Sequence, residues 1–395
     1  MRRLSSSKPS RGGFAPGLLL GLLLGVAVAV GVGAITGVLF GGDDDAVTEA
    51  RQTIEDNYFE AADAGELEDA SIRGMVDSLR KRYDDRFSHY FTEGQLRRFQ
   101  SATEGRFKGV GLVVSEVPKG LRVATVYPDT PAEEAGIETG DVITEVEGKS
   151  IAGVSSEVST SKIKGPPGTE VMLTVRSAAG GETRELTVER ADVRIPAVDR
   201  SGIRRAGGRR LGYVHYSTFS SGAHGELRDA IERLYRDGAE GLVLDLRGNG
   251  GGLLNEAILS SSIFVEDGRI ASTESRTQGE QSFEAVGDAI EPRPTVVLVN
   301  RDTASASEIL TAALKVNDLA TVVGTRTYGK GTFQEVIGLD VGGALDLTVG
   351  EYLTADGKSI LGTGVKPDVR VEDDPRTEDS DEALDRALEV LASQL

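Results

Sequence analysis

Apolar and polar positions follow three different patterns along this chain of 395 residues. Between residues 46 and 105, the stretches AVTEARQTIEDNYFEA and SIRGMVDSLRKRY place apolar or aromatic side chains near helical spacing. A turn and a short helix follow them, with Thr92 as a candidate N-cap. The sequence therefore predicts an N-terminal helical region over 46–105, which we interpret as a packing element.

The pattern changes at residue 106 to the alternation that is typical of strands. Apolar and polar residues alternate in GVGLVVSEV, GLRVATVY, DVITEVEGKSI, VMLTVRS and ETRELTVERA, and one short helical piece, TPAEEAG, interrupts them. We therefore expect a β-rich domain over 106–192.

Strands and helices alternate in the rest of the chain. We expect strands at 211–219, 241–246, 294–300 and 319–324, and helices at 224–238, 253–265 and 305–316. The strand GLVLDL is apolar on both faces, which predicts a central place in a parallel sheet. Residues 193–372 are thus expected to form an α/β core. We interpret 373–395 as an acidic linker and a C-terminal amphipathic helix with a solvated face.

The N-terminus combines a basic segment with a long uncharged one. Residues 1–13 carry Lys and Arg but no acid, and 14–40 contain no charged residue. Because about 20 apolar residues cross a bilayer as a helix, we expect 14–40 to be a transmembrane anchor. The basic flank would stay cytoplasmic and the body of the protein would be extracytoplasmic, periplasmic or extracellular. The alternative is a cleaved signal peptide, whose apolar region is usually shorter.

Charge and composition exclude several classes of function. The net charge of −19 argues against nucleic acid as a partner, because phosphate backbones attract clusters of Lys and Arg. The chain has no Cys, which excludes thiol catalysis, Cys-ligated zinc and disulfides. We expect neither a metal nor a cofactor.

Three loops follow three of the predicted strands: 247–252, 301–306 and 325–331. If those strands are parallel, all three loops emerge at the carboxyl edge of one sheet, where open α/β sheets place their sites. This geometry brings Gly251, Ser305 and Lys330 together.

Ser305 begins a predicted helix, where unpaired N–H groups carry partial positive charge. An oxyanion formed at Ser305 could take hydrogen bonds from such amides, including that of Ala306. The glycines at 250–252 offer a second donor, because glycine lets the backbone approach a substrate closely. The alternative is that Thr303 or Ser305 is merely a helix N-cap.

A nucleophilic serine needs a base. The three histidines, His89, His215 and His224, lie outside the three loops, and the chain has no GxSxG elbow. Lys330 lies in the third loop between two glycines, with aromatic residues close by. A lysine acts as a base only when neutral, and burial can lower its pKa by up to about 3–5 units. The alternative is a surface lysine in a glycine turn.

The β-rich segment resembles a PDZ domain. The resemblance is carried by Gly109, Val110, Gly111 and Leu112, by TPAEEAGIETGDVITEVEGKSI (130–151) and by KIKGPPGTEVMLTV (162–175). The glycine-rich turn can aim successive N–H groups outward, and the neighbouring strand edge can accept an added peptide strand. The resemblance therefore implies capture of protein or peptide C-termini, against the alternative of a β-domain that acts as a spacer.

The loops of the core resemble the active site of the C-terminal processing peptidases, or tail-specific proteases. The matching residues are NRDTASASEI and YGKGTFQ, joined by DDRFSHYFT (84–92), LDLRGNGGGLL (244–254) and GKSILGTGVKPDV (357–369). The resemblance covers nearly all of 46–372. It implies that Ser305 is the nucleophile, Lys330 the general base and Gln334 the residue that orients the lysine. It also implies oxyanion donors at the amides of Gly251 and Ala306, and a structural role for Ser307 and Glu308.

The same resemblance implies an α/β protease core of the ClpP/crotonase-like kind, with an inserted PDZ domain and an N-terminal helical segment. The chain departs from the family pattern at Gly248 and Gly250, which replace Asn and Pro and loosen the loop that carries Gly251. Ala355 replaces a Pro that often precedes the D-G pair, away from the predicted site.

These patterns together predict a membrane-anchored serine endopeptidase with a Ser-Lys dyad. Two alternatives belong to other classes: a catalytically silent PDZ adaptor at the membrane, and a trypsin-like PDZ protease that uses histidine. The order of the domains disfavours the second, because the PDZ segment precedes the core. A homo-oligomer and an adaptor protein are left open as further partners.

Overall fold

A computed structural model describes residues 46–179, 181–373 and 380–395, and the chain divides into two units at residue 75. The first unit contains α2 (Ala46–Asn57) and the start of α3 (Ala64–Tyr83). No helix within the described ranges is both long and apolar enough to cross a bilayer. The anchor expected at 14–40 lies outside the described residues.

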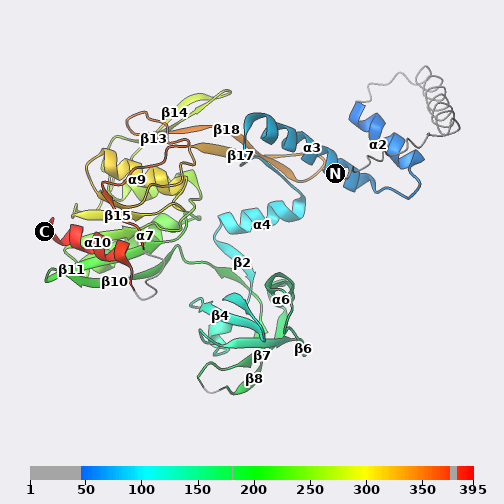
Figure 1. The fold of residues 1–395 in the computed structure, drawn as a ribbon, viewed down its shortest axis with the longest axis horizontal. Helices are drawn as coiled ribbons and strands as arrows, with labels where there is room; N and C mark the ends of the chain where they lie inside the picture. Colours follow the sequence, from blue (N-terminus) through cyan, green and yellow to red (C-terminus); the bar gives the residue numbers. More distant parts are fainter. Residues whose placement is uncertain (1–45, 180, 374–379) are drawn as a thin grey trace, which may run out of the picture. The chain divides into compact units, whose positions relative to one another are not determined.

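The second unit is built around a six-stranded sheet (Figure 1). Its strands run in the order β10 (Val198–Ala206), β11 (Arg209–Tyr216), β12 (Gly241–Asp245), β15 (Thr295–Val299), β16 (Thr321–Gly324) and β19 (Val369–Arg370). The first pair is an antiparallel hairpin, and all later neighbours are parallel. The parallel arrangement expected for 241–246, 294–300 and 319–324 is therefore confirmed.

Helices cover both faces of this sheet. On one face, α7 (Ala223–Arg236), α8 (Leu254–Ser262) and α9 (Ala306–Val316) pack on alternate strand residues. On the other face lies α10 (Glu382–Ala392), red in Figure 1. Strands β12 and β15 are consequently buried at every position, which explains why their sequences are apolar except for Asp245 and Thr295.

The C-terminal helix differs from its expected role as a solvated tail. Residues Ala383, Ala387, Leu388 and Leu391 of α10 are buried against the sheet. Burying one such leucine completely stabilises the fold by ~1.5–3 kcal/mol. Asp385 and Glu389 of this helix are exposed, and Asp381, at its N-cap, accepts a hydrogen bond from Arg247 at 2.7 Å. The tail is amphipathic, and its apolar face completes the core.

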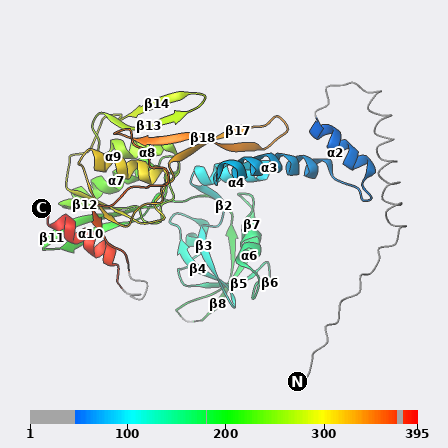
Figure 2. The same ribbon diagram turned by 45° about the horizontal axis from the view of Figure 1, so that its top comes forward.

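The β-rich domain is a separate sheet with its own core (Figure 2). Its strands run in the order β3 (Leu112–Val117), β4 (Gly120–Val126), β5 (Val142–Val146), β7 (Glu170–Arg176) and β8 (Thr183–Glu189), with the short β6 (Lys149–Ser150) beside β5. Helices α5 (Pro131–Glu134) and α6 (Ser156–Ile163) complete it. The chain enters through β2 (Arg106–Gly109) and leaves through β9 (Ala191–Arg194), and these two strands pair with each other.

A second, antiparallel sheet lies in the core unit and is not predicted by the sequence patterns. It contains β1 (His89–Phe91), β18 (Ala344–Thr354), β13 (Arg269–Ser275) and β14 (Gly279–Glu284), with β17 (Thr332–Gly338) also paired to β18. Strand β1 is followed by α4 (Glu93–Thr103). The predicted N-cap of α4 is confirmed, because the Thr92 hydroxyl accepts the N–H of Gln95.

Candidate active site

The three loops predicted to converge do so, because β12, β15 and β16 are parallel neighbours. Asn249, which is fully buried in the first loop, joins it to the second: its carbonyl accepts the Ala304 N–H and the Ser307 hydroxyl, both at 3.0 Å. The Tyr328 N–H of the third loop donates to the Thr303 carbonyl at 3.0 Å. Backbone hydrogen bonds therefore hold the three loops together.

Ser305 occupies the N-cap position of α9, but with an unusual backbone. Its φ of 57° and ψ of −119° differ from the extended conformation that N-caps normally adopt. A residue other than glycine held at positive φ costs ~1–3 kcal/mol, and such strain clusters at functional sites. With 6% of its surface exposed, Ser305 is held in this conformation by a buried environment. Its geometry favours a functional residue over a simple cap.

Glu308 connects the serine loop to the lysine loop. Its side chain is fully buried at the third position of α9. The carboxylate accepts the N–H groups of Ser305 at 2.9 Å, Gly329 at 2.7 Å and Lys330 at 2.9 Å, and it also accepts the Thr327 hydroxyl. The structural role expected for Glu308 is thus a specific one: it fixes the backbone of Ser305 relative to that of Lys330.

Gly251 lies directly against Ser305. Its φ is +102°, and a Cβ added there would be 2.8 Å from the Ser305 Cβ and 3.0 Å from the Ala306 nitrogen. The Gly251 N–H donates to the side-chain oxygen of Asn249 at 2.9 Å. Ala306 is the first residue of α9, so its N–H has no acceptor one turn earlier in the helix. The structure therefore brings Gly251, Ser305 and Ala306 together, with the Gly251 donor engaged by Asn249.

Lys330 lines the same cavity as Ser305 and is partly dehydrated. Burial lowers the pKa of its amine, while the negative charge of Asp346 acts in the opposite direction. The Nζ atom lies 4.7 Å from the centre of the Phe87 ring, a cation–π contact. Among the hydrogen bonds of the described residues, none joins Lys330 to Ser305. In this arrangement the lysine amine contacts the Phe87 ring.

Gln334 lies near Lys330 in the chain but is held by two threonines. Its Nε2 donates to the hydroxyls of Thr332 at 3.3 Å and Thr348 at 3.2 Å. Thr348 in turn donates to a carboxylate oxygen of Asp85 at 3.1 Å. The structure thus places Gln334 in the cavity wall, but its side chain is bonded to Thr332 and Thr348 and not to Lys330.

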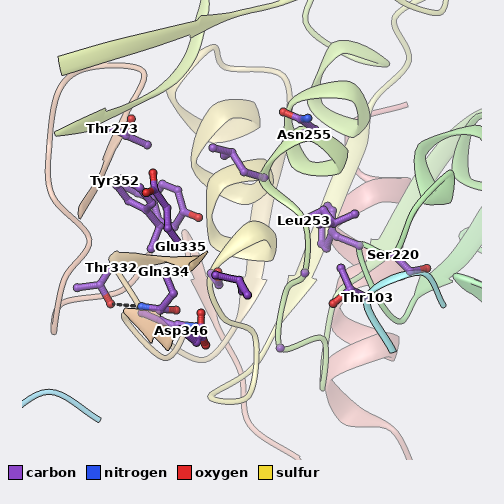
Figure 3. Close-up of a pocket in the computed structure, with 18 of the residues that line it drawn as sticks. Thr103, Ser220, Leu253, Asn255, Thr273, Thr332, Gln334, Glu335, Asp346 and Tyr352 are labelled. Carbon is purple, nitrogen blue, oxygen red and sulfur yellow. Dashed lines mark hydrogen bonds between the residues drawn. The ribbon is translucent and has the colours of Figure 1, made fainter. Parts of the chain in front are cut away.

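The cavity that joins these residues has a volume of about 830 Å³. Figure 3 shows Thr332, Gln334 and Asp346 at one side of it, and Thr103, Ser220 and Leu253 at the other. Asp346, Phe87 and Thr103 are among the residues at or beside the cavity to which the sequence patterns assign no role. Asp346 reaches the cavity through the pairing of β18 with strands distant in the sequence.

The histidines are engaged elsewhere. His215 pairs with Asp199, which raises the His215 pKa against the effect of burial, and His224 Nδ1 lies 2.7 Å from a carboxylate oxygen of Glu256. No histidine lines the cavity of Ser305. Within 46–179, 181–373 and 380–395, no group of three or more His, Asp or Glu side chains could hold a metal ion. Lys330 is the basic side chain that lines the cavity together with Ser305.

A second candidate site lies in the β-rich domain, in an apolar groove between β3 and α6. Three of the four predicted residues, Gly109, Val110 and Leu112, line it, together with Phe107, Val114, Thr160, Ile163 and Lys164. The fourth, Gly111, turns the chain at a φ of +98°, and a Cβ there would collide with Thr130. Within the part of the chain that the structure describes, β3 pairs with β4 and with no other strand, so its other edge is open to an added strand.

Comparison with known proteins gives two family matches. Residues 210–371 match the model of peptidase family S41, and residues 122–177 match a PDZ domain model. The chain is 35% identical over 329 residues to the carboxy-terminal processing protease CtpA of Bacillus subtilis (strain 168), over 83% of this chain and 69% of that one. A CtpA-like serine protease of Staphylococcus aureus (strain N315) is 34% identical over 81% of this chain and 63% of its own length.

Two solved structures align with most of the chain. A Bacteroides fragilis protein described as an S41 protease aligns with a TM-score of 0.57 and 19% identity, over 90% of this chain and 99% of that one. This likeness supports a shared fold. The photosystem II D1 C-terminal processing protease is 31% identical over 87% of this chain and 96% of that one, with a TM-score of 0.49.

Proposed function

The chain belongs to peptidase family S41 of serine proteases, and from this premise we propose that Ser305 and Lys330 form its catalytic dyad. Gln334 would orient the lysine, and the amides of Gly251 and Ala306 would hold the oxyanion. One observation carries the proposal: a strained, buried serine lines one cavity with a lysine whose pKa is lowered by burial. Perturbed lysines and strained backbones gather at functional sites.

The reaction is an acyl transfer in two stages. Neutral Lys330 takes the hydroxyl proton of Ser305 while the oxygen attacks the scissile carbonyl carbon. The C–N bond then breaks, and the lysine ammonium returns its proton to the departing amine, which leaves an ester on Ser305. Water adds to that ester and gives its proton to Lys330. The proton returns to the serine oxygen as the new carboxyl product departs.

The described arrangement fits a resting form of this site. For catalysis, the Lys330 amine would leave the Phe87 ring and approach the Ser305 hydroxyl. The Gly251 N–H would exchange its bond to Asn249 for one to the oxyanion, and Gln334 would leave Thr348. Hydrogen bonds of a catalytic site often tighten only when substrate is bound. Substrate binding would therefore assemble the dyad.

Casein turnover by Ser305→Ala and Lys330→Ala tests this assignment. Each variant should lose at least ~1,000-fold in turnover, because members of a catalytic unit fail together. Replacing His89, His215 and His224 one at a time serves as the matched control and should leave cleavage in place. Wild-type turnover by Ser305→Ala, or loss of cleavage in one histidine variant, would contradict the proposal.

The second candidate function is a catalytically silent adaptor. The lack of a hydrogen bond between Ser305 and Lys330, within the described residues, is the observation that favours it. A fluorophosphonate probe separates the two functions, because only an activated serine reacts with it. Labelling at Ser305 in the presence of a bound peptide supports the peptidase. A folded chain that stays unlabelled with peptide present supports the adaptor.

We propose further that the PDZ domain binds the C-terminal residues of protein substrates in the groove between β3 and α6. The open edge of β3, the glycine turn at 109–112 and Lys164 at the groove support this proposal. A peptide that fits the groove should bind at least ~10-fold more weakly as its C-terminal amide, because the carboxylate is then absent. Equal affinity of the acid and the amide, measured by fluorescence anisotropy, would contradict it.

Finally, we propose that residues 14–40 anchor the protein in a membrane with its peptidase core extracytoplasmic. We also propose that the core belongs with the ClpP/crotonase-like folds. The uncharged run behind a basic segment supports the anchor. The parallel sheet with its nucleophile at the start of α9 supports the fold. Alkaline extraction of membranes should leave the chain in the pellet. Release into the supernatant would contradict anchoring.

A further inference from the structure

One buried carboxylate of the cavity takes no part in the acyl transfer described above. Asp346 lies in β18 with 8% of its surface exposed, and it lines the cavity together with Ser305 and Lys330. Figure 3 shows its side chain close to Gln334. The cavity thus contains an acid as well as the base and the nucleophile.

Strand register determines where this carboxylate lies. Asp346 pairs with Val336 of β17 and with His89 of β1. Two positions further along β18, Thr348 accepts the Gln334 amide. Because alternate residues of a strand share one face, Asp346 and Thr348 lie on the same face of β18. The backbone therefore fixes the acid on the face of β18 that carries Thr348, the hydrogen-bond partner of Gln334.

The charges around Asp346 come from two other parts of the chain, the segment 85–89 and the loop of Lys330. Burial raises the pKa of Asp346, as does the negative charge of Asp85, whereas His89 and Lys330 lower it. From the other side, Asp346 is the neighbouring charge that acts on Lys330, and it favours the protonated amine. All of these neighbours act on Asp346 through space, because no hydrogen bond contributes to its shift.

The remaining titratable groups near Lys330 have other roles. Glu308, in α9, accepts the backbone N–H of Lys330. Glu335 lines the cavity and accepts a hydrogen bond from Gln278. Tyr352 also lines the cavity, and burial raises its pKa, so it stays neutral at working pH. Asp346 is therefore the acid whose charge bears on the lysine amine.

We propose that Asp346 is a positioning residue of the peptidase: its carboxylate stabilises the Lys330 ammonium from across the shared cavity in the resting site and so sets the pH at which the enzyme becomes active. The inference rests on the proposed function, since it requires Lys330 to be the general base. Two opposing effects then tune one amine. Burial disfavours the charged amine, and the carboxylate of Asp346 favours it.

The test is the pH dependence of Ser305 acylation in the full chain. The rate constant of fluorophosphonate labelling, measured from about pH 5 to pH 10, should rise along an acid limb that reports deprotonation of Lys330. In Asp346→Asn, the midpoint of this limb should fall by about one pH unit, since an adjacent charge shifts a pKa by about that much or more. Labelling below the midpoint should then be about tenfold faster.

Two further variants keep the test sharp. Asp346→Glu retains the charge and should return the midpoint toward that of the wild type. Asp340→Asn removes an exposed acid from the turn between β17 and β18. The midpoint of the acid limb in this variant should match that of the wild type. A merely structural role of Asp346 would lower the labelling rate at all pH values in both Asp346 variants and leave the midpoint unmoved.

The outcomes separate the inference from the proposed function. If Lys330→Ala labels at the wild-type rate, the dyad itself is wrong. If Lys330→Ala is inactive and Asp346→Asn has an unmoved midpoint, or one shifted to higher pH, the inference about Asp346 is overturned and the dyad stands. A lowered midpoint in Asp346→Asn alone, with both controls at the wild-type value, supports the inference.

Discussion

The two walls of the cavity are held in different ways. The nucleophile wall, formed by the loops 246–253 and 300–306, is fixed by buried backbone groups, with the Asn249 carbonyl accepting from both Ala304 and Ser307 at 3.0 Å. The base wall, formed by 330–338 and β18, depends on half-buried side chains, such as the contact of 3.2 Å between Gln334 and Thr348. Glu308 is the link between the two walls.

This difference suggests that one wall is rigid and that the other can rearrange. Ser305 keeps a strained backbone, and strain persists only where the surroundings over-determine it. Under the proposed mechanism, Lys330 would change partners between the resting and the catalytic state, which requires surroundings that rearrange at low energetic cost. We therefore expect variants of the nucleophile wall to act through geometry and fold, and variants of the base wall to act through protonation and orientation.

The largest effect is expected from Gly251→Ala in the nucleophile wall. The added Cβ would lie 2.8 Å from the Ser305 Cβ and 2.9 Å from the Ala304 oxygen, at a φ of +102° that alanine rarely adopts. Turnover should fall ~100–1,000-fold, as when an oxyanion donor is removed. Gly225→Ala in α7, which meets no atom within 4 Å, is the matched control. Comparable turnover in the two variants would remove Gly251 from the site.

The next largest effect is expected from Glu308→Gln, which weakens the link between the walls. The amide keeps one acceptor oxygen for the N–H groups of Ser305, Gly329 and Lys330, and its NH₂ group faces the others. Turnover should fall ~10–100-fold through misplacement of the dyad. Glu256→Gln is the control, because that buried carboxylate accepts from Gly222 and His224 outside the two walls.

Both glutamate variants should unfold at lower denaturant concentration. The free energy of unfolding should fall by ~1–3 kcal/mol, since each substitution leaves buried donors poorly satisfied. Only Glu308→Gln should lose turnover out of proportion to its stability. If Glu256→Gln loses as much turnover at equal stability, then Glu308 has no special role in joining the walls.

In the base wall, Lys330→Met should stabilise the fold. Burial lowers the pKa of Lys330 below its ordinary value, so the folded state disfavours a proton that the unfolded chain accepts. The cost is complete below the folded pKa and disappears as the pH rises from the folded pKa to the ordinary one. Urea unfolding at neutral pH should show a gain of ~0.5–2 kcal/mol, the range of single stabilising substitutions.

That gain should shrink as the pH is raised toward the ordinary pKa of lysine. Lys315→Met supplies the control, because the Lys315 amine is bonded to the Lys366 carbonyl and to Asp368, and should lose stability instead. A pH-independent difference between Lys330→Met and the wild type would contradict a dehydrated lysine.

The smallest effect is expected from Thr348→Val, which removes the acceptor of Gln334 and the donor to Asp85. The side chains of the base wall are expected to rearrange during catalysis in any case. The turnover number should therefore fall only ~2–5-fold with an unchanged KM, a loss similar to that of one neutral hydrogen bond. In a Gln334→Ala background, the same substitution should have no further effect. Additive losses in the double variant would show that Thr348 acts without Gln334.

The two walls also differ in how far the sequence predicted them. The loop convergence follows from apolar runs such as GLVLDL and TVVLV, since parallel strands buried on both faces leave little choice of arrangement. Ser305, Gly251 and Lys330 were expected together for that reason, and they lie on one cavity or directly beside it. Their catalytic roles stay predictions.

Asp346 and Phe87 could not be found in the same way. Asp346 reaches the cavity because β18 pairs with β1 and β17, and Phe87 reaches Lys330 from a segment more than 200 positions earlier in the chain. Such antiparallel pairings depend on register, and a slip by one residue would turn Asp346 to the opposite face.

Likewise, the helix at 382–392 is amphipathic by sequence, but only the sheet shows what its apolar face covers.

The paired strands β2 and β9 have a consequence for how this protein could be rebuilt. The Ile195 N–H donates to the Gly105 carbonyl at 2.7 Å, so the chain returns to its point of departure after the whole β-rich domain. A tight turn between those two positions would close the gap without stretching the polypeptide. Binding domains of other specificity could replace the β-rich domain at this junction, so that one peptidase core could be directed to different substrates.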